Sequence, residues 1–458
     1  MSLNCDVSIF FALSLLIISK LNYKETMAQH LHLFETENEF QDKRDNNYSE
    51  PWVSYTEENG KVVYNKSEEE KMLGEYLTFD VISGGNISWK TQTASQTRTI
   101  EYSKNGGDWA SITSSSSAVQ IPVEAGDSVR FRGNNPDYAE PSGYNNNLNY
   151  GNFGSSTCYY NVRGNIMSLI DSENFATMTE FPEASYSGKN RSNIFYKMFN
   201  GSSGIVSASG MILGATVVPY YGYSYMFYGA KSLTDIPKFR NGVSYGSDAC
   251  YYMFGGCNKI TSLDNFSTVF TCSGNSVFES MFSSCYGLTD IPDFSNSTLG
   301  YNCFRNMFSY CHGLTSITRT HLSSKTLAPS CYSYMFLGCS GLTTAPDLPA
   351  TVLTTGCYQY MFSGCTSLTT APVLPAKQLV SDCYYSMFGS CNALTGLTVY
   401  AEGENLGSSR DPYTDGFTRN ILNSFGVFHK SPNSTWNRND NQSNHSGIPS
   451  SWTVEDIT

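Results

Sequence analysis

Cysteine is the residue whose type and spacing most directly suggest chemistry in this chain. Fourteen cysteines occur in 458 residues, and twelve of them lie between residues 250 and 391. Several are separated by seven residues, as in Cys331 and Cys339 or Cys357 and Cys365. A zinc site needs four ligands at closer spacing, such as two cysteines separated by two residues. The observed spacing argues against zinc, and we expect no metal site.

Disulfides and buried thiols are the two remaining interpretations of these cysteines. A bridge within one pair is excluded if the segment is helical, because eight helical residues span about 12 Å. Bridged Cα atoms lie within about 7 Å of each other. The spacing therefore favours free thiols buried as small apolar side chains. Disulfides between neighbouring copies of the pattern are the alternative.

Tyrosine also recurs at fixed positions relative to a repeated Met-Phe pair. One column stands immediately before the Met and comprises Tyr225, Tyr252, Tyr334 and Tyr360. If these side chains point outward, they form a row of candidate ligand-facing residues for a sugar or a protein, because tyrosine combines a large apolar face with a polar tip. Packing between neighbouring turns is the alternative. A second column, three residues before the Met, is expected to be half-buried packing: Tyr223, Tyr332, Tyr358 and Tyr384.

No arrangement of residues in the sequence is typical of a catalytic site. The six histidines lie apart from any metal-binding or nucleophilic motif: His30, His32, His312, His321, His429 and His445. We find no G-x-S-x-G, no Gly-rich phosphate loop and no H-E-x-x-H motif. We therefore predict a protein that is not an enzyme, with no catalytic residues and no cofactor.

The elements that position these side chains are predicted by an internal repeat. Eight Met-Phe pairs recur at steps of 26 to 28 residues, beginning at Met198, Met226, Met253, Met281, Met307, Met335, Met361 and Met387. A period in this range is typical of a solenoid, in which each repeat packs on its neighbours. Cysteine four residues before and after the Met would share one helix face, and the following Leu-Thr segment is typical of a short strand. The expected fold is an α+β repeat solenoid with a short helix and a short strand per turn.

The repeated pattern x-x-M-F-x-G-C-x-x-L-T-x-x-P resembles the BspA-type leucine-rich repeats. The resemblance covers residues 173–400, about half the chain. It implies a surface or secreted protein of bacteria or protists, with a role in adhesion or host interaction. Similar repeats occur in phages of gut bacteria. The early copies depart from the pattern, since Ala230 stands where later copies have cysteine.

The segments before the repeats differ in composition. Residues 1–33 form a leader whose apolar run from Val7 to Ser19 has the length of a signal-peptide core. The alternative is that translation starts at Met27. Residues 34–74 are polar and acid-rich, which predicts a flexible arm. The net charge of -12 and the lack of basic patches argue against nucleic acid as a partner.

Two further regions flank the solenoid. Short alternating runs in residues 75–139 predict a small immunoglobulin-like β-sandwich, with Trp89 and Trp109 as core residues. Residues 140–172 are expected to join it to the repeats and cover the first of them. Residues 401–458 break the period and predict a C-terminal cap, in which Trp436 and Trp452 cover the last turn.

These features favour a non-enzymatic, surface-exposed protein that recognises a host-cell or bacterial surface protein or glycan. From Met198 to Tyr400 the chain has eight Lys plus Arg and eight Asp plus Glu, so the repeat surface is nearly neutral. No integral membrane span is expected. The first alternative is a phage tail or fibre component on the virion surface, attached through the N-terminal arm. The second is a hydrolase whose site has no recognised motif.

Overall fold

The structure of the chain, a computed structural model, divides into two compact units, Met1–Ser67 and Glu68–Thr458. It describes residues 55–58, 61–64, 67–91, 97–114, 116–135, 141–142, 147–148, 151–181, 193–272, 274–295, 298–317, 319–322, 324–407, 411–421, 425–439 and 447–458. The expected leader, residues 1–33, lies outside these ranges. In the first unit, β1 (Tyr55–Glu58) and β2 (Lys61–Tyr64) form an antiparallel hairpin.

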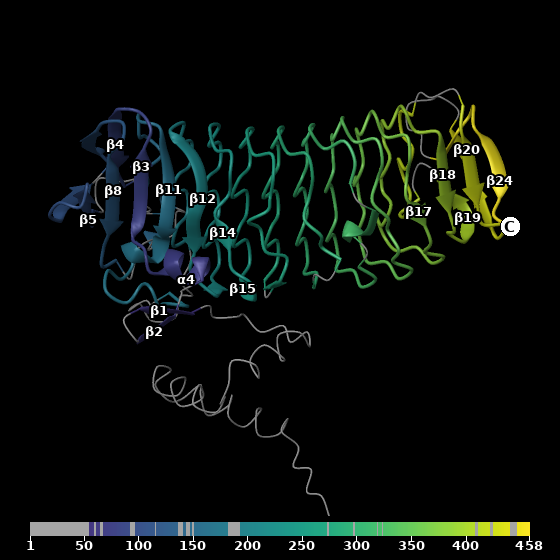
Figure 1. The fold of residues 1–458 in the computed structure, drawn as a ribbon. Coiled ribbons are helices and arrows are strands. Elements are labelled where there is room, and N and C mark those ends of the chain that lie inside the picture. Colours follow the sequence, from purple (N-terminus) through teal and green to yellow (C-terminus); the bar gives the residue numbers. More distant parts are fainter. Residues whose placement is uncertain are drawn as a thin grey trace, which may run out of the picture. The chain divides into compact units, whose positions relative to one another are not determined.

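The second unit begins with a mixed β-sheet that continues into the first turns of the solenoid (Figure 1). After the short helix α4 (Glu68–Leu73), its antiparallel part consists of β3 (Leu77–Val81), β5 (Arg98–Lys104), β6 (Ala110–Ser114) and β8 (Ser128–Arg132). β11 (Tyr160–Asn165) pairs antiparallel with β3 and parallel with β12 (Ile205–Leu213). One sheet therefore contains both the N-terminal strands and the first parallel strand of the repeats.

A separate antiparallel pair, β4 (Gly85–Trp89) with β7 (Val119–Val123), completes this region. Trp89 is fully buried and its ring contacts Phe153 at 4.7 Å, which confirms it as a core residue. Trp109 is not a core residue, because it lies half-buried beneath the Arg132 guanidinium at 4.2 Å. The remaining short pair is β9 (Pro141–Ser142) with β10 (Asn147–Leu148).

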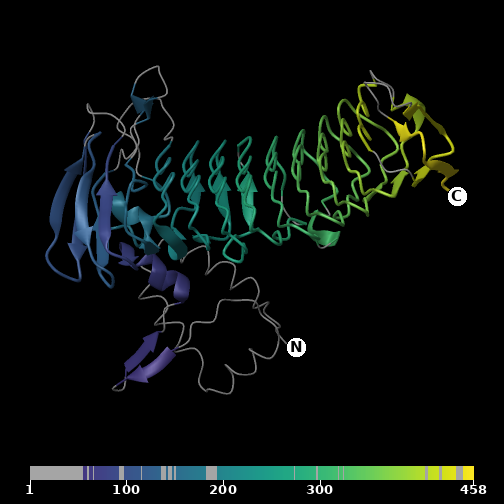
Figure 2. The same cartoon turned by 90° about the horizontal axis from the view of Figure 1, so that it is seen from above.

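The repeats form a β-solenoid of about eight turns with a repeat of about 27 residues and almost no helix. The turns lie side by side in a row, as Figures 1 and 2 show. Their short parallel strands are β13 (Val217–Val218), β14 (Lys238–Phe239), β15 (Val243–Tyr245), β16 (Phe270–Cys272), β17 (Val373–Leu374) and β18 (Gly396–Val399). Among the described residues, helices are confined to α4 and two 3-10 turns, η1 (Ile166–Leu169) and η2 (Arg319–Leu322).

The prediction of a helix in each repeat is therefore wrong, and the backbone hydrogen bonds show why. Around Met361, alternate amides donate to the carbonyl three residues earlier, as from Met361 to Tyr358. The amides between them donate to the next turn, as from Phe362 to Met387 at 3.0 Å. The segment is a series of overlapping β-turns. An α-helix would instead direct every amide four residues back along its own chain.

A left-handed backbone at every fourth residue produces this conformation. In each of the eight repeats, φ is positive at three positions: five residues before the Met, one before it and three after it. In the repeat of Met226 these are Tyr221, Tyr225 and Gly229, with φ of 53°, 54° and 69°. A type II turn requires positive φ at its third residue. The four-residue spacing that suggested a helix face is thus the spacing of successive turns.

Aromatic stacking fills the centre of the solenoid. The Phe of every Met-Phe pair is fully buried, and seven consecutive ring contacts connect Phe199 to Phe388. Their centroids are 5.1 to 6.0 Å apart. The eight Met side chains and the aliphatic residues seven positions after them are also fully buried. Each turn therefore buries its apolar side chains against the next turn as well as within itself.

The repeat cysteines are free thiols, and twelve of the thirteen cysteines in the described residues are buried. Six thiols, four residues after the Met, donate to the carbonyl of the Phe one turn earlier at 3.0 to 3.2 Å: Cys257, Cys285, Cys311, Cys339, Cys365 and Cys391. The prediction that the repeat cysteines are buried free thiols is confirmed. The structure adds a role that the spacing did not predict, since each thiol provides a hydrogen-bond donor to a buried carbonyl.

The parallel ladder continues beyond the last Met-Phe pair. β20 (Val427–Lys430) pairs with β18, and β24 (Thr453–Asp456) pairs with β20. Shorter pairs are β19 (Gly403–Leu406) with β21 (Ser434–Trp436), and β22 (Arg438–Asn439) with β23 (Ile448–Pro449). Trp452 is buried, whereas Trp436 is half-buried. In the part of the chain that the structure describes, no helix is long and apolar enough to cross a membrane.

Candidate recognition surface

The four tyrosines predicted to face a ligand occupy one column on the overlapping turns. The position immediately before the Met is filled in order by Lys197, Tyr225, Tyr252, Ser280, Asn306, Tyr334, Tyr360 and Ser386. All eight residues have positive φ. The four tyrosines are half-buried, so part of each side chain reaches the surface. Ser280 and Asn306 separate the column into two tyrosine pairs.

The first pair lies within a larger group. The rings of Tyr225 and Tyr252 stack with centroids 5.5 Å apart and planes 5° from parallel. Five more tyrosines connect to them through ring contacts of 4.2 to 6.5 Å. The tyrosine cluster therefore comprises Tyr196, Tyr220, Tyr221, Tyr225, Tyr228, Tyr251 and Tyr252, which lie on three consecutive turns.

Contacts between the rings cover part of the cluster. Tyr225 and Tyr252 cover one face of each other, and the ring of Tyr228 lies at 70° and 74° to them with centroids 5.5 and 5.9 Å away. Tyr220 and Tyr228 are the most exposed members, with 43% and 41% of their surface accessible. The other five members are half-buried.

The second pair is smaller. Tyr334 and Tyr360 stack at 4.7 Å with planes 12° apart, and Tyr385 contacts Tyr360 at 5.3 Å. The Arg305 guanidinium lies 5.4 Å from the ring centre of Tyr334 and forms an ion pair with Glu279 at 3.7 Å. A cation near an aromatic face adds a favourable electrostatic contact.

Charges of opposite sign flank the tyrosine cluster. The Lys197 amine lies 5.0 Å from the ring centre of Tyr196 and 5.5 Å from that of Tyr225. On the other side, burial and the nearby Glu279 carboxylate raise the pKa of Asp248 to about 6. Burial also raises the pKa of Tyr225 and Tyr251. These tyrosine hydroxyls stay protonated at neutral pH, and the two are hydrogen-bonded to each other.

Sequence reasoning identified only two members of the cluster. Tyr196 and Tyr251 stand two residues before the Met, Tyr221 five before it and Tyr228 two after it. Only the column immediately before the Met was considered as outward-facing, so the other members were missed, although positions three and four residues apart would also share one face of a helix. The column three residues before the Met is fully buried instead of half-buried, because its rings stack between turns at about 6 Å. Within the described residues, its hydroxyls on Tyr223, Tyr332, Tyr358 and Tyr384 have no hydrogen-bond partner.

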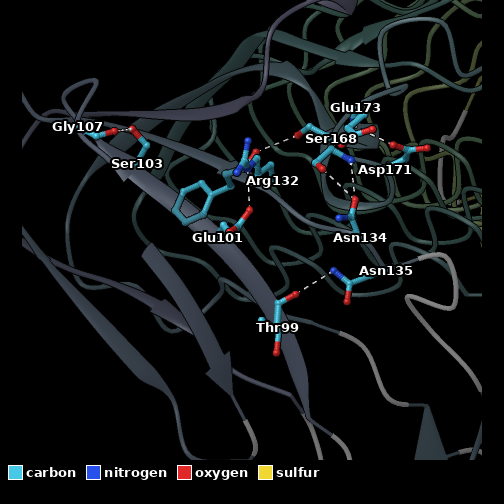
Figure 3. A network of polar contacts seen from close by, with 12 residues as sticks. Thr99, Glu101, Ser103, Gly107, Arg132, Asn134, Asn135, Ser168, Asp171 and Glu173 are labelled. Atoms are coloured by element: carbon cyan, nitrogen blue, oxygen red, sulfur yellow. Dashed lines mark hydrogen bonds and ion pairs between the residues drawn. The ribbon is translucent and has the colours of Figure 1, made fainter. Parts of the chain in front are cut away.

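A network of polar side chains connects the N-terminal sheet to the segment that follows it (Figure 3). Arg132 donates to Glu101 at 2.7 Å, and Ser168 donates to the carbonyl of Phe131 at 3.1 Å. Asn134 accepts hydrogen bonds from the amide and hydroxyl of Ser172. These bonds connect β5 and β8 to η1 and the loop after it. Their donors and acceptors satisfy one another, which is the pattern of a structural network.

A shallow groove of about 340 Å³ on the solenoid is lined by Asp264, Asp290 and Asp293 among other residues. Across the described ranges, however, no three His, Cys, Asp or Glu side chains are placed to hold a metal ion. The predicted absence of a catalytic site and a cofactor stays a prediction.

Comparisons with known proteins identify no relative of this chain. No family model matches the chain, and neither a curated protein nor a solved structure is significantly similar to it. The tyrosine cluster is therefore interpreted from its own geometry.

Proposed function

We propose that this chain is a non-enzymatic recognition protein that binds a protein partner through the tyrosine cluster. The observation that supports it most is the convergence of seven tyrosines on three consecutive turns. Tyrosine gives large contact area at low entropic cost, because it has only two side-chain torsions. The overlapping turns and their bonds to neighbouring turns hold these side chains in place before any partner arrives, which lowers the cost of binding.

Two features favour a protein over a glycan as the partner. Sugar rings stack on open aromatic faces, but Tyr225 and Tyr252 cover each other. The partly exposed neighbouring positions on the turns include Gly and Asn, such as Asn200, Gly229 and Gly256. A rigid tyrosine set among such residues is the composition of antibody binding loops. Flanking charges such as Lys197 and Asp248 would orient a partner with complementary charges.

The family and location are part of the same proposal. The repeated Met-Phe, Cys and Leu positions support membership of the BspA-type leucine-rich repeat class, as a divergent member. The proposed location is the cell surface or the extracellular space. The strands of residues 75–139 would serve as an immunoglobulin-like mount for the solenoid.

Binding to intact cells tests the proposal with substitutions taken from the chain itself. Ser280 and Ser386 occupy the column of Tyr225 and Tyr252 with the same backbone conformation. The double variant Tyr225→Ser, Tyr252→Ser should therefore keep the fold while removing the centre of the cluster. The variant Tyr334→Ser, Tyr360→Ser is the matched control.

Fluorescently labelled protein would be incubated with bacterial and epithelial cells, before and after protease treatment of the cells, and applied to a glycan array. We expect the first variant to lose roughly tenfold or more in affinity, as for the loss of a hot-spot residue. Protease treatment of the cells should abolish binding, and the control variant should retain it. Binding to the array that survives protease treatment would replace a protein partner with a glycan, and equal binding by all variants would exclude the cluster.

A further inference from the structure

Cys272 and Cys303 are the described cysteines whose sulfur atoms lie next to each other. Their Sγ atoms are 2.9 Å apart. Cys272 ends β16, and Cys303 stands four residues before Met307 on the following turn. A disulfide bond is about 2.05 Å long, so the sulfur atoms need to approach by only about 1 Å.

The two thiols differ in their access to solvent. Cys272 is half-buried, whereas the other twelve described cysteines, Cys303 among them, are buried. Burial raises the pKa of the Cys303 thiol, and the neighbouring Cys272 adds to this effect. A soluble oxidant therefore reaches Cys272 first, and Cys303 is positioned to react second.

The other repeat cysteines are arranged differently. The column four residues after the Met directs its thiols at backbone carbonyls, as Cys285 does toward Phe254 at 3.2 Å. Cys272 belongs to neither cysteine column, because it lies nine residues before Met281. It contacts Cys303 because the end of β16 lies beside the following turn.

We propose that Cys272 and Cys303 form a reversible disulfide between neighbouring turns when the protein meets a small-molecule disulfide. In the first step, the Cys272 thiolate attacks one sulfur of oxidised glutathione, and one glutathione thiolate leaves. In the second, the Cys303 thiolate attacks the Cys272 sulfur and releases the other glutathione. The two cysteines lose two electrons and two protons, and two molecules of reduced glutathione carry them away.

The bond would close a loop that contains one full turn of the solenoid. Neighbouring turns are otherwise held together by the connecting chain, hydrogen bonds, packing and ion pairs such as that of Arg305 with Glu279. The modification would therefore restrict local separation of the two turns, since a cross-link removes chain entropy from the opened state.

A single tryptic peptide makes the test direct. No Lys or Arg lies between Lys259 and Arg305, so Cys272, Cys285 and Cys303 occur in one peptide, residues 260–305. The folded full-length protein is incubated with oxidised glutathione, denatured, labelled with iodoacetamide and digested. We expect one label, on Cys285. Apart from the mass of this label, the peptide should be lighter by two hydrogen atoms than the same peptide with three free thiols. Dithiothreitol before labelling should restore three labels.

Variants separate the proposal from other outcomes. The variant Cys272→Ser removes the half-buried thiol, so both Cys285 and Cys303 should be labelled. In the control Cys339→Ser, whose hydroxyl can still donate to the Phe308 carbonyl, the single-label pattern should remain. Three labels in the oxidised wild-type protein, or glutathione retained on Cys272 with Cys303 labelled, would overturn the proposal. Circular dichroism of each variant establishes that the labelled protein is folded.

Discussion

The side chains that form the proposed surface occupy backbone positions that also accept other residues. Tyr225, Ser280 and Asn306 share one column and one left-handed conformation. The carbonyls and amides of the turns make the same bonds at each of them, for example from Tyr225 to Tyr251 and from Ser280 to Arg305. Surface side chains can therefore change from turn to turn without altering the scaffold. Recognition in this protein depends on which residue each turn presents.

Asp248 should make stability depend on pH in a defined direction. Its pKa is raised from 3.8 to about 6 by burial and Glu279. Between pH 4 and 6 the folded state holds the proton that the unfolded state has released, so this group's contribution to stability falls as pH rises and is fully lost above about pH 6. Because Asp248 is partly exposed, solvent screening limits the effect to about 1 kcal/mol.

The variant Asp248→Asn tests this, since asparagine tolerates positive φ. The free energy of unfolding of the variant minus that of the wild type should be larger at pH 7 than at pH 4, by about 1 kcal/mol. Urea denaturation at both pH values measures it. An identical difference between the two proteins at both pH values would contradict the assigned pKa.

At the level of elements, the overlapping turns replace the helix that the spacing suggested. Three residues per repeat adopt positive φ, a conformation that costs most residues about 1–2 kcal/mol. Five of the eight repeats place glycine at the third position: Gly201, Gly229, Gly256, Gly338 and Gly364. Where a residue other than glycine occupies one of these positions, the hydrogen bonds between turns and the Phe stack offset this cost. Isolated repeats should therefore lack this conformation.

Ser390 provides the corresponding prediction. It occupies the third position with φ of 61° and is half-buried. Ser390→Gly should leave stability unchanged or raise it slightly, while Ser390→Val should lower it by about 1–2 kcal/mol, because a β-branched side chain opposes this backbone. Chemical denaturation under reducing conditions measures both. Equal stability of the two variants would argue against a left-handed residue at this position.

At the level of the Glu68–Thr458 unit, the solenoid must protect the edge of its last strand. β24 covers β20, with Lys430 paired to Asp456 at 2.6 Å and His429 to Glu455 at 3.4 Å. The outer strand Thr453–Asp456 is short, and two of its four residues are acidic. Such features discourage pairing with another chain. At the other end, β11 is covered by the antiparallel strand β3.

Removal of residues 447–458 should expose the edge of β20 and the apolar surface that Trp452 covers. We expect the truncated protein to self-associate at concentrations where the full chain does not, because an uncovered strand edge is a template for pairing. Light scattering after size-exclusion chromatography measures this. A chain that ends at Asp456 retains β24 and is the control. A truncated protein with the mass of the intact species and no tendency to associate would show that β24 does not act as a cap.

The sequence by itself determined the repeat, its period and the buried columns. Met, Phe and Leu recur at the same positions in each turn, and an apolar column of this kind can be buried only by stacking the turns. The number of turns, the solenoid architecture and the buried free thiols followed from that pattern. The absence of a match to known proteins did not limit these inferences, because the copies within the chain serve as their own alignment.

The tertiary structure decided the conformation of each turn and the pairs formed between turns. A spacing of four residues is common to a helix face and to overlapping β-turns, and only hydrogen bonds to the next turn distinguish them. The tyrosine cluster combines residues from three consecutive turns, which only the contacts between those turns bring together. Cys272 approaches Cys303 from outside both cysteine columns, and β11 joins the N-terminal strands to the solenoid in one sheet. These are contacts between distant segments, which no local pattern of residues encodes.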